Sequence, residues 1–87
     1  MDKTYTIKYW IDEEAREHAI SHMIEEGGKK LSFTQADKAI EVAKKSRKDG
    51  SLACVEVISS DEDEGDYGVV YHSSVDGESV NIITLNS

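Results

Sequence analysis

The sequence contains no proline and only one cysteine among its 87 residues. A single cysteine, Cys54, excludes an internal disulfide, and a chain without disulfides is typical of the reducing cytoplasm. No apolar run approaches the roughly 20 residues that a membrane-spanning helix needs, and the N-terminal residues alternate and soon turn acidic, unlike a secretory signal peptide. Repeats and low-complexity segments are also missing. We therefore expect one small cytoplasmic domain spanning residues 1–87.

Basic residues are missing from the C-terminal part of the chain. All ten lysines and arginines lie between Lys3 and Lys48, whereas acidic residues occur as far as Glu78. Residues 1–50 carry ten acidic and ten basic side chains, so the net charge of -8 belongs to residues 51–87. A region of one sign attracts basic surfaces and repels nucleic acid and anionic membranes, so neither of these is an expected direct partner.

The N-terminal part predicts a strand followed by a helix. Residues 4–11 alternate between apolar and polar side chains, and this period of two is typical of a strand with one buried face. Residues 12–26 place apolar side chains at helical spacing after Asp12, a favourable N-cap, and Gly27-Gly28 is expected to stop this helix. Trp10 falls on the polar side of the strand, where it either covers a helix end or forms an exposed anchor.

A short extended link, residues 29–33, leads to a second predicted helix. This helix runs from Gln35 to about Lys48, with apolar side chains on one side and charged side chains on the other. Thr34 is the expected N-cap, and Gly50 is expected to end the helix.

Three strands are predicted in the C-terminal part, at residues 52–58, 67–72 and 79–85. The links between them are short and contain glycine and aspartate, which favours hairpin connections. The predicted fold is therefore an α+β domain of order β-α-α-β-β-β. Two helices would pack on one face of its antiparallel sheet, and residues 51–87 would form a meander.

Two groups of residues have some features of a metal site. The turn 61–66 has five carboxylates in six residues, but it fails the EF-hand pattern because glycine falls fifth and position twelve is His72. We interpret this turn as a solvated hairpin tip or as an acidic recognition surface. His18 and His22 lie four residues apart on the predicted helix, but a third ligand would have to come from His72 or a carboxylate. We interpret this pair as residues at the rim of the apolar side.

Nothing in the sequence predicts a catalytic centre. Cys54 lies in the middle of a predicted strand, so we interpret it as a packing residue and not as a nucleophile. The chain has no glycine-rich phosphate loop and no serine elbow, and no carboxylate pair can be argued to be an acid and a base. We therefore expect no enzyme activity, no cofactor and no metal.

The run KKLSFTQADKAIEVAKKSRKDGSLACVEVISSDEDEGDYGVVY, about residues 29–72, resembles the strand–helix–hairpin core of very small proteins of phages and mobile elements. Some anti-CRISPR proteins have this general arrangement. The resemblance implies a short single domain without an active site, whose outer surface sequesters a partner. It rests on arrangement and transfers no functional residue.

These observations favour a non-enzymatic, acidic protein-binding module. Its partner would be a protein with a basic, nucleic-acid-binding-type site, such as a defence nuclease, and the module would act as a phage-encoded anti-defence inhibitor in the host cytoplasm. The alternative is a small-ligand-binding or self-associating domain, a homodimer included, which uses Trp10, Tyr67, Tyr71 and His72. The predicted partner-binding residues are Glu56, Asp61, Glu62, Asp63, Glu64, Asp66, Asp76, Glu78 and Trp10.

Overall fold

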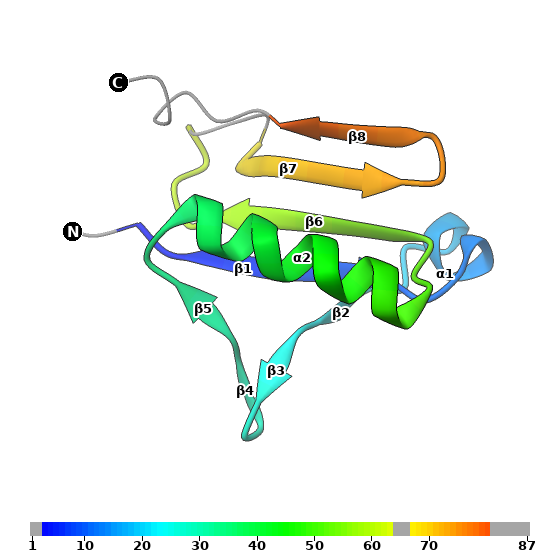
Figure 1. Ribbon diagram of the computed structural model, residues 1–87, viewed down its shortest axis with the longest axis horizontal. Helices are drawn as coiled ribbons and strands as arrows, with labels where there is room; N and C mark the ends of the chain where they lie inside the picture. The colour runs from blue at the N-terminus through cyan, green and yellow to red at the C-terminus, as the bar shows by residue number, and fades with distance from the viewer. Residues whose placement is uncertain (1–2, 64–66, 81–87) are drawn as a thin grey trace.

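A computed structural model describes residues 3–63 and 67–80 of the chain, and most of its strands join one antiparallel sheet (Figure 1). The strand order is β2-β1-β6-β7-β8, and β5 also pairs with β1. A separate two-stranded sheet joins β3 to β4. In chain order the elements are β1 (Tyr5–Trp10), α1 (Glu13–Glu17), β2 (His22–Met23), β3 (Glu25–Glu26), β4 (Lys29–Lys30), β5 (Ser32–Phe33), α2 (Ala36–Gly50), β6 (Cys54–Ser59), β7 (Val69–Ser74) and β8 (Gly77–Val80).

The core lies between α2 and one face of the sheet, where α2 runs across β1 and β6 (Figure 1). Ala39 and Ala43 are fully buried, and their small side chains let the helix approach the strands closely. Alternation along β6 turns Val55 and Val57 toward the helix, and both are fully buried. The buried core residues are Tyr5, Ile7, Ala36, Ala39, Ile40, Ala43, Val55, Val57, Val70 and Tyr71.

The helix predicted for residues 12–26 is wrong beyond its first turn. Asp12 caps α1 as expected, its Oδ1 accepting a hydrogen bond from the backbone N–H of Ala15 at 2.8 Å. The helix ends at Glu17, and Ala19 follows with a left-handed φ of 56°. Extending a helix that buries no side chain would add little stability. The residues that follow α1 instead form backbone hydrogen bonds with the edge of β1. Thus Ile24 N–H donates to the Ile7 carbonyl at 3.0 Å.

The pair Gly27-Gly28 does not stop a helix but forms the turn of the β3–β4 hairpin. Its φ values of 61° and 81° are those that a two-residue hairpin turn requires. The flanking strands pair Glu25 with Lys30 and Glu26 with Lys29, so opposite charges face each other across the hairpin.

The second predicted helix is present, with small changes at its ends. α2 begins after Gln35, whose side chain makes no capping hydrogen bond, so the expected Thr34 cap is wrong. Gly50 lies inside the helix, and Ser51, with a left-handed φ of 52°, ends it.

The predicted α+β class is confirmed: the domain has an antiparallel sheet and two helices. The predicted β-α-α-β-β-β order is not confirmed, because four two-residue strands lie between the helices. Packing of both helices on one face is not confirmed either, since α1 lies at the end of the sheet (Figure 1). The strand predicted at 79–85 overlaps the end of β8, which begins earlier at Gly77, and residues 81–85 lie outside the described residues. Within the described ranges, no helix has the length and apolar character needed to cross a membrane.

Candidate functional site

The face of the sheet that α2 does not cover, called here the open face, gathers polar side chains from three strands. Because Val55 and Val57 point toward α2, alternation along β6 turns Cys54 and Glu56 to the open face. The strand register then places His72 of β7 directly opposite Glu56, with Lys8 of β1 opposite it on the other side. Three adjacent strands therefore present a thiol, a carboxylate, an imidazole and an amine on one surface.

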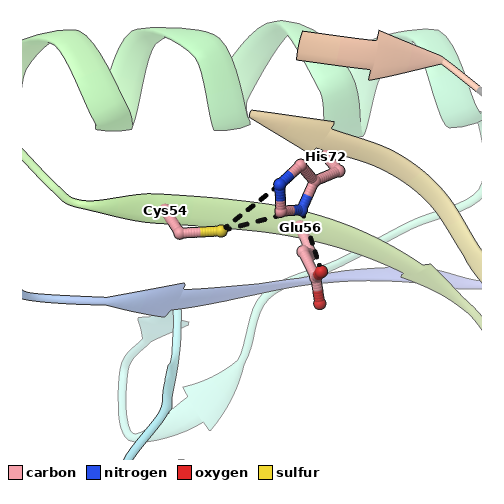
Figure 2. Close-up of side chains that lie close together, drawn as sticks. All are labelled: Cys54, Glu56 and His72. Atoms are coloured by element: carbon pink, nitrogen blue, oxygen red, sulfur yellow. Dashed lines mark hydrogen bonds and ion pairs between the residues drawn. The ribbon is translucent and has the colours of Figure 1, made fainter. Parts of the chain in front are cut away.

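Cys54, Glu56 and His72 form a compact cluster on the open face (Figure 2). His72 Nδ1 lies 3.0 Å from Glu56 Oε2, within hydrogen-bond distance. Cys54 Sγ lies 3.7 Å from Nδ1 and 4.0 Å from Nε2 of the same ring. Because the sulfur is nearly as far from one nitrogen as from the other, it is not aligned with a single nitrogen in the way that a nucleophile is aligned with its base.

The surroundings of Cys54 keep its thiol protonated. Burial raises the pKa of Cys54 above its ordinary value, and the negative charge of Glu56 raises it further. Arg16 and Arg47 lower this pKa by smaller amounts. A reactive cysteine needs the opposite, a depressed pKa and partial exposure, whereas Cys54 is only 1% exposed. The geometry and the pKa together argue against a nucleophilic role.

The acidic residues predicted to bind a partner are spread over the sheet. Asp61, Glu62 and Asp63 follow β6 at one end of the sheet, whereas Asp76 and Glu78 surround the β7–β8 turn at the other end. The six residues of β7 separate the two ends by about 20 Å. The acids therefore form two separate groups, and the sequence pattern, which pointed to the turn 61–66, does not show that Asp76 and Glu78 lie apart from it. Of the remaining predicted acids, Glu64 and Asp66 lie outside the described residues.

Several of these carboxylates already have intramolecular partners. Asp61 Oδ2 lies 3.6 Å from Lys3 Nζ, and Asp61 Oδ1 accepts a hydrogen bond from the Asp63 backbone N–H at 3.0 Å. Glu78 Oε2 accepts a hydrogen bond from the Tyr71 hydroxyl at 2.6 Å. Burial and this hydrogen bond both raise the pKa of Tyr71. The side chains of Asp61 and Glu78 thus have structural roles that their sequence positions do not reveal.

The aromatic residues do not assemble into the predicted ligand-binding set. Trp10 is only 9% exposed, with Lys8 Nζ 4.9 Å from the ring centroid, so it is a packing residue and not an exposed anchor. Tyr71 belongs to the core beneath α2, on the opposite side of the sheet from His72. Tyr67 is 89% exposed and lies beside the acidic turn that follows β6.

The histidines are also arranged differently from the sequence interpretation. His18 is the C-cap residue of α1, whereas His22 belongs to β2 and stacks on Tyr9 with ring centroids 5.5 Å apart. The two residues therefore do not share one side of a helix.

Two of the depressions formed by the described residues border the sheet. A groove of about 470 Å³ lies between α2 and the segment that contains β2 and β3, with an apolar floor and charged residues at its rim. A smaller depression of about 280 Å³ lies on the open face beside His72, between α1 and the β7–β8 hairpin. The groove is lined by Tyr9, Ile24, Glu25, Val42, Lys45, Ser46, Asp49 and Leu52, and the depression by Arg16, His72, Ser74, Asp76, Gly77, Glu78 and Ser79.

Sequence reasoning missed the cluster of Cys54, Glu56 and His72. The spacing of Cys54 and Glu56, two apart on one strand, is a signal that they share a face, but His72 joins them only through strand register. Comparisons of the chain with protein-family models, with curated proteins and with solved structures find no match. Function must therefore be argued from the geometry of this chain.

Proposed function

We propose that the protein is a non-enzymatic binding module whose acidic surface engages a basic, nucleic-acid-binding-type site on a partner protein. The observation that carries the proposal is the connection after β6, where Glu62, Asp63 and Tyr67 are exposed: Tyr67 is 89% exposed, and Gly68 next to it lies against the backbone of Glu62. Tyrosine is enriched among residues that dominate binding energy, and surrounding charges set orientation and association rate. An exposed aromatic ring in a connection that also exposes carboxylates is thus suited to a partner with a pocket and basic rim.

Charge complementarity supports a basic partner. No lysine or arginine follows Lys48 in the sequence, so the strands and turns after α2 contribute carboxylates without basic residues between them. Proteins that bind nucleic acid do so through lysine and arginine side chains that neutralise phosphates. Carboxylates at the end of a sheet can occupy such a site in place of phosphates and thereby exclude the nucleic acid.

The narrowest form of the proposal is an anti-defence role. A small phage-encoded protein in the host cytoplasm would block the nucleic-acid groove of a defence nuclease. This form rests on the resemblance of residues 29–72 to small phage and mobile-element proteins, whereas the broader form rests on the surface of the chain alone.

The test is a charge-matched pair of variants. Glu62→Gln/Asp63→Asn removes two carboxylates beside Tyr67 and spares Asp61, which caps its own turn. Glu25→Gln/Glu26→Gln removes the same number from the β3–β4 hairpin, which projects away from β7 and β8 (Figure 1). Proteins that the wild-type chain retains at low salt would be purified, and their affinities for both variants would be measured with and without competing nucleic acid.

We expect the first variant to bind about tenfold more weakly and the second to bind as the wild type does. Binding should also fade as salt rises and should compete with nucleic acid. Equal affinities for the two variants, or binding that is indifferent to salt and to nucleic acid, would contradict the proposal.

The second candidate is a small-ligand site in the groove beside α2. The observation that favours it is the apolar floor formed by Tyr9, Val42 and Leu52, with Lys45 and Asp49 at the rim. A ligand held there would bind with little dependence on salt, and Val42→Trp would fill the groove and abolish binding. The same variant would leave binding of a basic protein at the acidic turn unchanged, so the two functions can be separated.

A further inference from the structure

We propose that Cys54, Glu56 and His72 form a zinc-binding site on the open face of the sheet. A thiolate, a carboxylate and an imidazole are the three side-chain groups that ligate Zn²⁺ in proteins. Here one ligand atom from each lies within 4.8 Å of the other two. The proposal is independent of the protein-binding function, and it replaces the expectation of no metal that the sequence supports.

The distances between the ligand atoms suit one ion with little rearrangement. Zinc bonds of roughly 2.3 Å to sulfur and 2.0–2.2 Å to nitrogen and oxygen, in tetrahedral geometry, separate the ligand atoms by about 3.3–3.6 Å. The observed separations are 3.7 Å between Cys54 Sγ and His72 Nδ1 and 3.0 Å between His72 Nδ1 and Glu56 Oε2. The third separation, between Cys54 Sγ and the Glu56 carboxylate, is at most 4.8 Å, so inserting an ion requires shifts of up to about 1 Å, within the reach of side-chain rotation.

The strands hold the three side chains in place before any ion binds. Cys54 and Glu56 project from the same face of β6 because they are two residues apart, and His72 is the register partner of Glu56 on β7 (Figure 2). Backbone hydrogen bonds of the sheet, not a mobile loop, thus fix the relative positions of the ligands. A site on strands is more precise than one on loops, because its ligands lose less conformational freedom on binding.

The charges of the ligands match a divalent ion. When zinc binds, the Cys54 thiol releases its proton to solvent, so that a thiolate, a carboxylate and a neutral imidazole surround the ion. The charges of the first two ligands and of Zn²⁺ then sum to zero, which suits a half-buried position: the side chains of His72 and Glu56 are 30% and 19% exposed. The sulfur and nitrogen ligands disfavour Ca²⁺ and Mg²⁺, which prefer oxygen.

Of the three ligands, His72 lines the depression of about 280 Å³, and on this side we expect the fourth coordination position. Ser74 and Ser79 lie in this depression with room for a water molecule, which would complete a tetrahedral shell. Arg16 also lines the depression, where its positive charge opposes the ion, whereas the carboxylates of Asp76 and Glu78 favour it. Three protein ligands predict weaker binding than a four-ligand structural site would show.

The experiment is metal titration of the full chain after treatment with a chelator. Zn²⁺ binding would be measured by calorimetry and by competition with a zinc-sensitive dye. Co²⁺ would be added separately as a spectroscopic probe, because a thiolate ligand produces a charge-transfer absorption that oxygen and nitrogen ligands do not. We expect one ion per chain, the thiolate–cobalt absorption, and a higher Tm with zinc than without it.

Variants identify the ligands. Cys54→Ser, Glu56→Gln and His72→Ala should each weaken Zn²⁺ binding by about 100-fold, since loss of even an outer-shell partner costs 10–100-fold. Glu56→Gln preserves shape and remains informative if a change at the buried Cys54 impairs folding. The control is His18→Ala/His22→Ala, which removes the other two histidines of the chain and should leave both the affinity and the cobalt spectrum unchanged.

The proposal would be overturned by any of three results. Zinc affinity could be equal in the wild type and in Glu56→Gln, the cobalt spectrum could lack the thiolate absorption, or the His18/His22 control could abolish binding. Each of these would assign the metal to another part of the chain, or to none, and would leave the cluster as a hydrogen-bonded pair beside a packing cysteine.

Discussion

The face of the sheet beneath α2 carries valine, isoleucine and tyrosine, whereas the open face carries a cysteine, a carboxylate and a histidine. Alternate residues of β6 contribute to the two faces: one set points toward α2 and the other toward the open face. On the covered face each side chain is excluded from water by a helix whose alanines permit close approach. On the open face Glu56 and His72 stay partly exposed and bond to each other, beside the buried Cys54. Because neighbouring residues of a strand point to opposite faces, the residues that stabilise the fold and the residues of the polar cluster lie on different faces. A substitution on one face is therefore expected to leave the packing of the other face unchanged.

The largest expected effect lies on the covered face. Ile40→Ala should lower the free energy of unfolding by about 2–4 kcal/mol, because Ile40 is 7% exposed and its removal leaves a cavity in the core. Urea denaturation would measure the change. Ile20→Ala is the control, since Ile20 is 54% exposed and should contribute less than about 0.5 kcal/mol. An unchanged midpoint for Ile40→Ala would show that α2 does not pack as described.

The open face should contribute less to stability. In chelator-treated protein, a double-mutant cycle of Glu56→Ala and His72→Ala should give a coupling energy of about 0.5–1.5 kcal/mol, the net value of one partly exposed hydrogen bond. Denaturation curves of the four proteins supply the cycle. A coupling as large as the Ile40 effect would mean that the two faces are equally important for folding.

The hydrogen bond between Tyr71 and Glu78 adds a pH dependence to the covered face. Tyr71→Phe should cost about 1 kcal/mol at neutral pH. The pKa of Tyr71 is raised above its ordinary value of 10.0, so the folded state holds the phenolic proton more tightly than the unfolded state does. The stability that the protonated Tyr71 contributes is thus fully present below pH 10 and declines as the pH rises above that value.

The measurement is the difference in unfolding free energy between wild type and Tyr71→Phe at a series of alkaline pH values. This difference cancels the contribution of Cys54, whose raised pKa also makes stability decline at alkaline pH in both proteins. A difference that grows with pH would contradict the assignment.

The smallest expected effect belongs to the acidic turn. Glu62→Gln/Asp63→Asn should change stability by less than about 0.5 kcal/mol, because both side chains are exposed and lie outside the core. Thermal melts of this variant and the wild type should therefore nearly coincide. A large gain in stability would show that repulsion at this turn strains the fold, and any change in partner binding would then need correction for that gain.

The sequence predicted those helices and strands whose apolar residues, at regular spacing, are the residues that the fold buries. The alternation of residues 4–11 predicted β1, and the apolar stripe of the second helix predicted α2 within two residues at each end. The helix predicted for residues 12–26 was wrong because its apolar spacing includes Ile20, which the fold leaves 54% exposed. The signal that favours the observed hairpin, EEGGKK with opposite charges around two glycines, lay in the same stretch.

The cluster could be predicted only in part. Alternation alone places Cys54 beside Glu56 on one face of β6. The position of His72 depends on the register between β6 and β7, which shifts at a bulge between Val57 and Ile58. No local pattern in the sequence reports such a shift, because a bulge changes pairing without changing the alternation on either side of it.

The pairing of β1 with β6 also has a consequence for how the chain folds. Tyr5 pairs with Ser59 and Trp10 with Cys54, so the central strand pair joins segments separated by the whole of both helices and the β3–β4 hairpin. The β7–β8 hairpin, whose residues Ser74 and Gly77 pair, closes over a much shorter length of chain. Loop-closure entropy therefore favours early formation of the C-terminal hairpins and late addition of β1. The slowest step in reaching the native state should then be the closure that brings Trp10 against β6, and Trp10, the only tryptophan in the chain, reports that step directly through its fluorescence.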